Sequence, residues 1–114
     1  MGIDLTIQGA RPNCVILKLI MINHFKCKET KLIWSGIASR RLPHDIQHTA
    51  RRKLRMLNNA KVLEDLRIPP NNRLESLVGN RKGQHSIRIN QQWWICFVWL
   101  DGGVVEQVEI VDYH

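Results

Sequence analysis

The C-terminal part of the chain alternates apolar and polar side chains over three segments, and this pattern constrains the fold more than any other. The segments are residues 84–90, 93–100 and 104–111, and they are separated by short polar or glycine-containing loops. Alternation with a period of two indicates β-strands with one buried face. Loops this short join antiparallel neighbours. The sequence therefore predicts an antiparallel meander that ends close to the C-terminus.

The loop between the first two strands decides which side chains share a face. A two-residue loop would separate the isoleucines of the first strand from Trp93, whereas the three-residue loop Asn90-Gln91-Gln92 unites them. A one-residue slip moves every side chain to the other face, so the longer loop is favoured because it gathers one apolar face. That face holds Ile87, Ile89, Trp93, Ile95, Phe97 and Trp99. The opposite face holds Ser86, Arg88, Trp94 and Cys96, with Arg88 opposite Trp94, and we expect that face to be available for function.

Two helices are predicted upstream of the meander. A short one covers residues 29–34, and a longer one opens at Pro43 and fades near Leu63. The longer helix has an apolar stripe at helical spacing, formed by Ile46, Ala50, Leu54 and Leu57. Its basic residues are expected off the stripe, facing water or a partner: Arg51, Arg52, Lys53 and Arg55. With a short strand at residues 22–26, the sequence predicts an α+β domain, with an N-terminal strand and helices on a twisted, mainly antiparallel sheet.

The first twenty residues fit this domain poorly. Their apolar run is interrupted by Lys18, is too short to cross a bilayer and lacks the features of a signal peptide. We expect residues 1–20 to be an extension that is disordered or not native, and residues 21–114 to form the domain. An odd number of cysteines without a CxxC motif is typical of a reducing compartment, so we expect a cytoplasmic protein with no membrane partner.

The charge of the chain is unevenly distributed. Its formal net charge is +7, and residues 40–100 carry twelve basic and four acidic side chains, whereas residues 101–114 carry four acidic and no basic ones. A basic middle favours a polyanion, above all nucleic acid, as partner. A solvated basic helix face without a ligand is the alternative.

Three motifs together resemble one family. They are SIRIN at residues 86–90, W-x-I-C-F at residues 93–97 and the terminal DYH at residues 112–114. From about Met21 to His114 the chain resembles the HigB-like ("Killer protein") branch of the RelE/ParE toxin superfamily. The resemblance implies a RelE-like fold and a ribosome-dependent endoribonuclease that cuts mRNA in the A site. It also implies a HigA-like antitoxin with a helix-turn-helix domain, and contact with operator DNA only through the toxin–antitoxin complex.

The family's functional positions carry over unevenly. Asp112, Tyr113 and His114 match its C-terminal active-site residues, and Glu75 stands where some relatives have a catalytic histidine. Trp94 departs from the pattern, because relatives usually have an arginine there that contacts the scissile phosphate. What this puts in doubt is either the strength of catalysis or the identity of the phosphate-binding residue.

The residues themselves suggest roles in metal-free RNA cleavage. His114 can serve as acid or base near neutral pH, and Glu75 can act as the base or orient His114. Asp112 is suited to orienting a neighbour, and Tyr113 to stacking or hydrogen bonding. A phosphate can be held by the basic residues Arg73, Arg81, Lys82 and Arg88. We expect no cofactor and no metal, since His44 and His48 have ligand spacing but no evident third ligand.

Several alternatives stay open from the sequence. Trp94 can stack on an RNA base or contact a protein partner. Glu75 can simply pair with Arg73, and residues 81–82 can form a plain solvated turn. At the level of function, the alternatives are a ParE-like toxin that inhibits gyrase by binding, and a weakly active homologue that serves mainly as a corepressor. The terminal DYH favours the nuclease, because a pure binder does not need an acid/base cluster.

Overall fold

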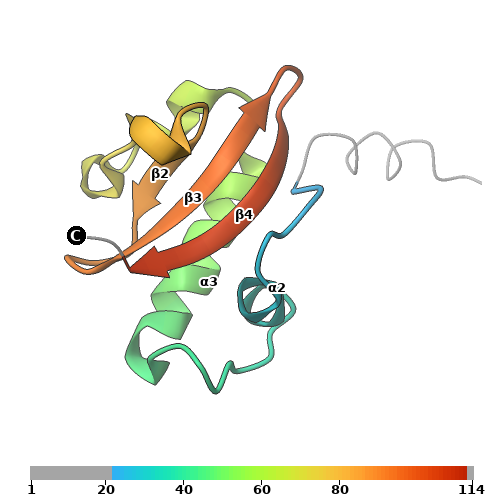
Figure 1. Cartoon of the computed structure of the whole chain (residues 1–114), viewed down its shortest axis with the longest axis vertical. Helices are drawn as coiled ribbons and strands as arrows, with labels where there is room; N and C mark the ends of the chain where they lie inside the picture. Colours follow the sequence, from blue (N-terminus) through green and yellow to red (C-terminus); the bar gives the residue numbers. More distant parts are fainter. Residues whose placement is uncertain (1–21, 113–114) are drawn as a thin grey trace, which may run out of the picture.

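A computed structural model describes residues 22–112 and shows an α+β fold (Figure 1). Within these residues four antiparallel strands form one sheet in the order β1-β2-β3-β4. The strands are β1 (Glu75–Ser76), β2 (His85–Arg88), β3 (Trp93–Leu100) and β4 (Val104–Asp112). Helices α2 (Lys28–Trp34) and α3 (His44–Asn59) precede them, and the 3-10 turns are η1 (Leu63–Arg67), η2 (Pro70–Asn72) and η3 (Gly79–Arg81). The predicted α+β class is confirmed, whereas the expected extension at residues 1–20 lies outside the described residues.

The register of the meander is the predicted one. Ile87 pairs with Ile95 and Arg88 with Trp94, and the Ile89 N–H donates to the Trp93 oxygen at 2.9 Å, so residues 90–92 form the predicted three-residue loop. The Asn90 side-chain oxygen accepts hydrogen bonds from the backbone N–H groups of Gln92 and Trp93, at 2.8 Å each. An asparagine that satisfies the backbone two and three residues ahead stabilises a tight turn, which explains why the strands reverse here.

The core lies between one face of the sheet and α3, which runs behind β3 and β4 in Figure 1. The predicted apolar face is confirmed, since Ile87, Ile95 and Phe97 are fully buried and the two outer tryptophans, Trp93 and Trp99, pack against the core. The predicted helix stripe is also buried: Ile46, Ala50, Leu54 and Leu57. Burying a leucine or isoleucine side chain contributes about 1.5–3 kcal/mol relative to exposure, so this contact stabilises the fold.

The segment predicted as a strand at residues 22–26 pairs with β4 only through two isolated parallel bridges, Ile22 with Val105 and Phe25 with Val108. The prediction of a regular strand is wrong. The reason lies in β4, where Gln107 has a φ of 54° between the two bridged valines and interrupts the ladder. Backbone hydrogen bonds of 2.8–3.1 Å nevertheless hold the segment along this edge.

Two predictions for α3 also need correction. The helix ends at Asn59 rather than near Leu63, because Ala60 is extended and η1 begins shortly afterwards. The Asp65 carboxylate accepts the backbone N–H groups of Lys61 and Val62 and so anchors this new turn. Lys53, expected to lie off the apolar stripe and face water or a partner, is only 3% exposed. Its amine donates a hydrogen bond to the side-chain oxygen of the fully buried Asn72, which η2 brings against the helix.

Candidate functional site

The sheet face opposite α3 divides into a covered half and an exposed half. Ser86 and Cys96 pair side by side in the covered half, and both are fully buried. Arg81 reaches from η3 to Glu109 on β4, with 3.0 Å between its Nη1 and the carboxylate, and contacts Gln84 at 3.1 Å. Because β3 lies between β2 and β4, this side chain crosses the sheet above Cys96. The expectation that Ser86 and Cys96 lie on a face available for function is therefore wrong.

The Cys96 thiol in this covered half is unreactive near neutral pH. Burial raises the pKa of Cys96 to about 11, and the nearby charges of Arg81, Glu109 and Lys26 modify that shift only secondarily. A thiol with so high a pKa stays protonated near neutral pH, and the thiolate is the reactive form. Cys96 thus serves as a small buried side chain, and Glu109 is occupied by Arg81 and by Lys26 at 3.6 Å.

The exposed half contains the pair Arg88 and Trp94, both half-buried. Arg88 donates from Nε to the backbone oxygen of Asn90 at 2.9 Å, which fixes the guanidinium at the sheet end next to the β2–β3 turn. Within residues 22–112, its two Nη atoms make no hydrogen bond. In register with this pair lies Val111 of β4. A fixed guanidinium beside an indole ring offers a charge and a stacking surface to one ligand.

The C-terminal end of β4 reaches the same turn. Asp112 pairs with Trp93, and its carboxylate accepts a hydrogen bond from the Gln92 side chain at 2.9 Å. The structure therefore brings Asp112 to the sheet end that carries Arg88 and Trp94, although its partner Trp93 belongs to the opposite face. Tyr113 and His114 follow directly in the chain and lie outside the described residues, so their predicted roles stay predictions.

The remaining predicted site residues are placed separately. Glu75 is exposed on β1 and pairs with Ser86, so it borders the covered half. Arg73 is exposed and closes η2 in a left-handed conformation, with a φ of 48°. Between Glu75 and Arg73 the structure has no ion pair. Lys82 is exposed immediately after η3, whereas the neighbouring Arg81 is engaged by Glu109.

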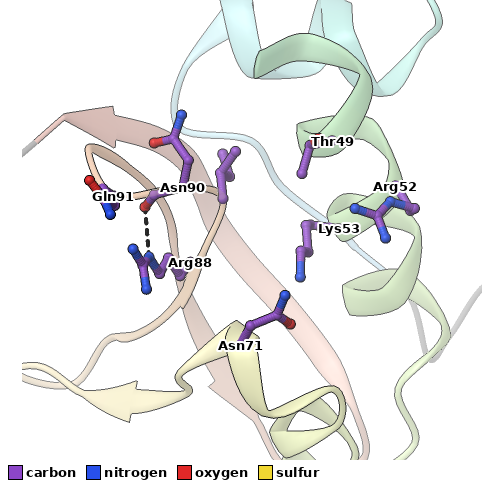
Figure 2. A pocket seen from close by; sticks show the side chains of 8 residues that line it. Thr49, Arg52, Lys53, Asn71, Arg88, Asn90 and Gln91 are labelled. Carbon is purple, nitrogen blue, oxygen red and sulfur yellow. Dashed lines mark hydrogen bonds between the residues drawn. The ribbon is translucent and has the colours of Figure 1, made fainter. Parts of the chain in front are cut away.

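Sequence reasoning missed a pocket of about 310 Å³ between α3 and the β2–β3 turn (Figure 2). Its polar wall includes Arg52, Lys53, Asn71, Arg88, Asn90 and Gln91. Burial, reinforced by the positive charge of Arg52, lowers the pKa of the Lys53 amine. The basic residues of α3 were recognised in the sequence, but their position opposite Arg88 depends on packing between distant segments. No simple sequence signal reports that position.

One further titratable group belongs to the inner face of the sheet. His85 stacks on Phe97 with 6.0 Å between ring centroids, and its Nδ1 is buried without a hydrogen-bond partner among the described residues. Burial lowers the pKa of this imidazole. Its placement on the inner face of the sheet, away from the half-buried Arg88 and Trp94 pair, indicates a structural role.

Comparison with known proteins places this architecture in a family. A family model described as the RelE-like toxin HigB of type II toxin–antitoxin systems matches residues 23–114. Toxin HigB-1 of Vibrio cholerae serotype O1 is 49% identical over 63 residues, which cover 55% of this chain and 66% of the relative. An uncharacterized protein of Haemophilus influenzae is 34% identical over 62 residues, which cover 54% of this chain and 61% of the relative. The matched segments thus span less than two thirds of either relative.

None of the helices in the described part of the chain is long and apolar enough to cross a membrane. The fold packs α2 and α3 against an antiparallel sheet, and the family match extends over most of the chain, including the whole meander and the terminal DYH motif. The chain therefore belongs to the HigB-like toxins, the RelE-like toxins of type II toxin–antitoxin systems.

Proposed function

We propose that the chain is an mRNA endoribonuclease that acts on ribosome-bound mRNA in the A site. The observation that supports this most is the register of the sheet, which brings Arg88, Trp94 and Asp112 to one end. Tyr113 and His114 continue the chain from that end. This sheet end supplies a cation for the phosphate and an aromatic surface for a base, and the proposal assigns the acid/base role that RNA cleavage also requires to His114 of the terminal motif.

The chemical step is an attack of the RNA 2′-oxygen on the adjacent phosphorus. The new P–O2′ bond forms as the P–O5′ bond breaks, leaving a 2′,3′-cyclic phosphate and a free 5′-hydroxyl. In this proposal Glu75 accepts the 2′-hydroxyl proton and His114 donates a proton to the leaving 5′-oxygen. Arg88 offsets the negative charge that develops on the phosphorane, with Arg73 and Lys82 holding flanking phosphates. Asp112 orients the terminal residues, and Tyr113 stacks on the RNA.

Arg81 has a more limited role than the sequence suggested. Its guanidinium is already held by Glu109 and Gln84, so binding a phosphate would require that contact to loosen. We propose that Arg81 chiefly contributes positive potential to the site. Trp94 takes the place of a phosphate-binding arginine, and we propose that it stacks on a base next to the cleaved bond.

The partners of this function are proposed from the family. We propose a HigA-like antitoxin with a helix-turn-helix domain as the partner protein, operator DNA as a contact of the complex, and the cytoplasm as its location. The formation of a stable complex when both chains are co-expressed, and binding of that complex to operator DNA, test this part.

Primer extension on mRNA translated by purified ribosomes tests the nuclease. Wild-type protein is expected to give cuts in the A-site codon, and His114→Ala is expected to slow them about 10²–10⁴-fold because an acid/base group is lost. His44→Ala is the matched control, since His44 is exposed at the start of α3. Undiminished cutting by His114→Ala would show that the acid is another group. The absence of cuts by wild type, together with inhibited DNA supercoiling, would instead indicate a gyrase-binding toxin.

A second variant tests the departure at Trp94. If a cation at this position strengthens the grip on the phosphate, Trp94→Arg raises the cleavage rate, whereas Trp94→Phe retains the wild-type rate. A wild-type protein that cuts only weakly, and is restored by Trp94→Arg, would indicate a homologue that acts mainly as a corepressor.

A further inference from the structure

The pocket between α3 and the β2–β3 turn has a wall suited to an anion. Arg52 and Lys53 come from α3, and Arg88 comes from β2 on the other side. Figure 2 shows Lys53 extending from α3 toward Asn71, with Arg88 across the pocket beside Asn90. Amide groups complete the polar wall, and none of the described residues that line the pocket is acidic. Such a collection of N–H donors and positive charges without a carboxylate favours a phosphate group.

Lys53 is the unusual member of this wall. It is 3% exposed and has Ile46, Ala50 and Leu54 as buried neighbours on the same helix. A buried ammonium group is costly unless it is hydrogen-bonded or paired with an anion. Within the described part of the chain its partner is the neutral amide of Asn72, and an ammonium group has three donors. An anion in the pocket would satisfy another donor and would compensate the charge.

The pocket also lies next to the proposed cleavage site. Asn90 and Gln91 line it, and the next residue, Gln92, holds the carboxylate of Asp112 at the end of β4. Arg88 belongs to both regions, because it lines the pocket and stands opposite Trp94. A strand of RNA that crosses the end of the sheet would therefore reach the pocket within the same turn.

We propose that this pocket binds a backbone phosphate of single-stranded mRNA next to the phosphate that is cleaved, with Arg52 and Lys53 of α3 as RNA-binding residues. The inference rests on the proposed function, because it takes RNA as the ligand. The pocket itself carries no base-reading role here. Its contribution is to fix the position of the RNA strand relative to the terminal acid/base residues. Such positioning contributes much of the rate enhancement when the reacting atoms must be aligned.

The test uses a labelled, single-stranded RNA with 2′-O-methyl groups throughout, titrated with the full chain without ribosomes. Arg52→Gln removes an exposed charge at the pocket, and Arg55→Gln removes an exposed charge of the same helix outside it. We expect Arg52→Gln to raise the Kd about fivefold and to lower the slope of log Kd against log salt by about 0.7, as the loss of one phosphate contact predicts. Arg55→Gln is expected to change both much less, and Arg52→Lys to retain the slope.

Equal effects of Arg52→Gln and Arg55→Gln would overturn the proposal, because they would indicate diffuse charge rather than a pocket. Inorganic phosphate, replacing chloride at the same ionic strength, distinguishes RNA from a small phosphate compound. If inorganic phosphate binds with an Arg52-dependent Kd while the Kd for RNA is the same in wild type and Arg52→Gln, the pocket is a site for free phosphate and the RNA assignment is wrong. If RNA binding is unchanged but Arg52→Gln releases a bound antitoxin, the pocket holds a carboxylate of that protein and the proposal is also wrong.

The RNA probe separates this inference from the proposed function. It lacks the attacking 2′-hydroxyl, so its binding does not depend on whether the protein cleaves. An Arg52-dependent Kd without cleavage of ribosome-bound mRNA would refute the nuclease alone. Cleavage that depends on His114, with identical binding by both arginine variants, would refute the pocket alone.

Discussion

A side-chain hydrogen bond joins the terminal part of β4 to α2, and its removal has a calculable effect. The backbone N–H of Ile110 donates to the Thr30 hydroxyl oxygen at 3.0 Å, and Thr30 is fully buried. In Thr30→Val the side chain keeps nearly the same shape but loses the acceptor. The buried N–H of Ile110 is then left unsatisfied, which costs about 1–3 kcal/mol. For a domain of this size, each kcal/mol lowers the Tm by about 4–8 °C.

Thermal unfolding and amide hydrogen exchange measure this effect together. Thr30→Ser is the matched control, because it keeps the oxygen and loses one methyl group, at about 1 kcal/mol. Both variants are therefore expected to lose stability, but only Thr30→Val is expected to lose protection of the Ile110 amide. An Ile110 amide that exchanges equally slowly in wild type and Thr30→Val, with an unchanged Tm, would refute the reasoning.

Three further predictions concern the core residue Leu54, the half-buried His85 and the buried Cys96. Leu54→Ala is expected to lower the free energy of unfolding in urea by about 2–5 kcal/mol, because Leu54 is fully buried under the sheet. Arg55→Ala, on the solvent side of the same helix, is expected to change it by less than about 0.5 kcal/mol. Because the pKa of His85 is lowered in the folded protein, the unfolded chain binds more protons below pH 6.5. The free energy of unfolding should therefore fall as the pH drops from 6.5 through the folded-state pKa. His85→Gln should flatten this dependence when unfolding is measured at each pH. Cys96, whose pKa is about 11, should resist maleimide in the folded protein near neutral pH and react fully in denaturant. Peptide mapping measures the labelling, and rapid labelling of Cys96 in the folded protein would contradict its burial.

The meander was predictable because its determinants are local. Alternation fixes which side chains share a face, and Asn90 supplies the turn, so the pairing of Arg88 with Trp94 followed from the sequence. The apolar stripe of α3 was predictable for the same reason, since helical spacing alone defines it. Both features depend on residues that are close to one another in the sequence.

The errors arose where distant segments meet. Alternation predicts that Ser86 and Cys96 share a face but says nothing about what covers that face, which depends on an ion pair between Arg81 and Glu109, 28 residues apart. Its charge predicted that Lys53 faces water or a partner molecule, whereas Asn72, 19 residues away in the same chain, is its buried hydrogen-bond partner. A polar contact between a side chain and a turn far away in the sequence leaves no periodic pattern of apolar and polar residues. Analysis of such patterns therefore cannot reveal it.

The tryptophan at position 94, where the resemblance to the family implies an arginine, has a structural context in the sheet. Cross-strand neighbours on one face have Cβ atoms about 4.5–5.5 Å apart, so the side chains of Arg88 and Trp94 lie in the same small region of the sheet. Two arginines placed there would repel each other until an anion bound between them, whereas an indole beside one guanidinium is stable without a ligand. The positive charge that the site lacks at position 94 is present on the other side of Arg88, where Arg52 and Lys53 face the pocket. In the proposed function, this arrangement places phosphate binding at the junction of β2 and α3 rather than in the middle of the sheet.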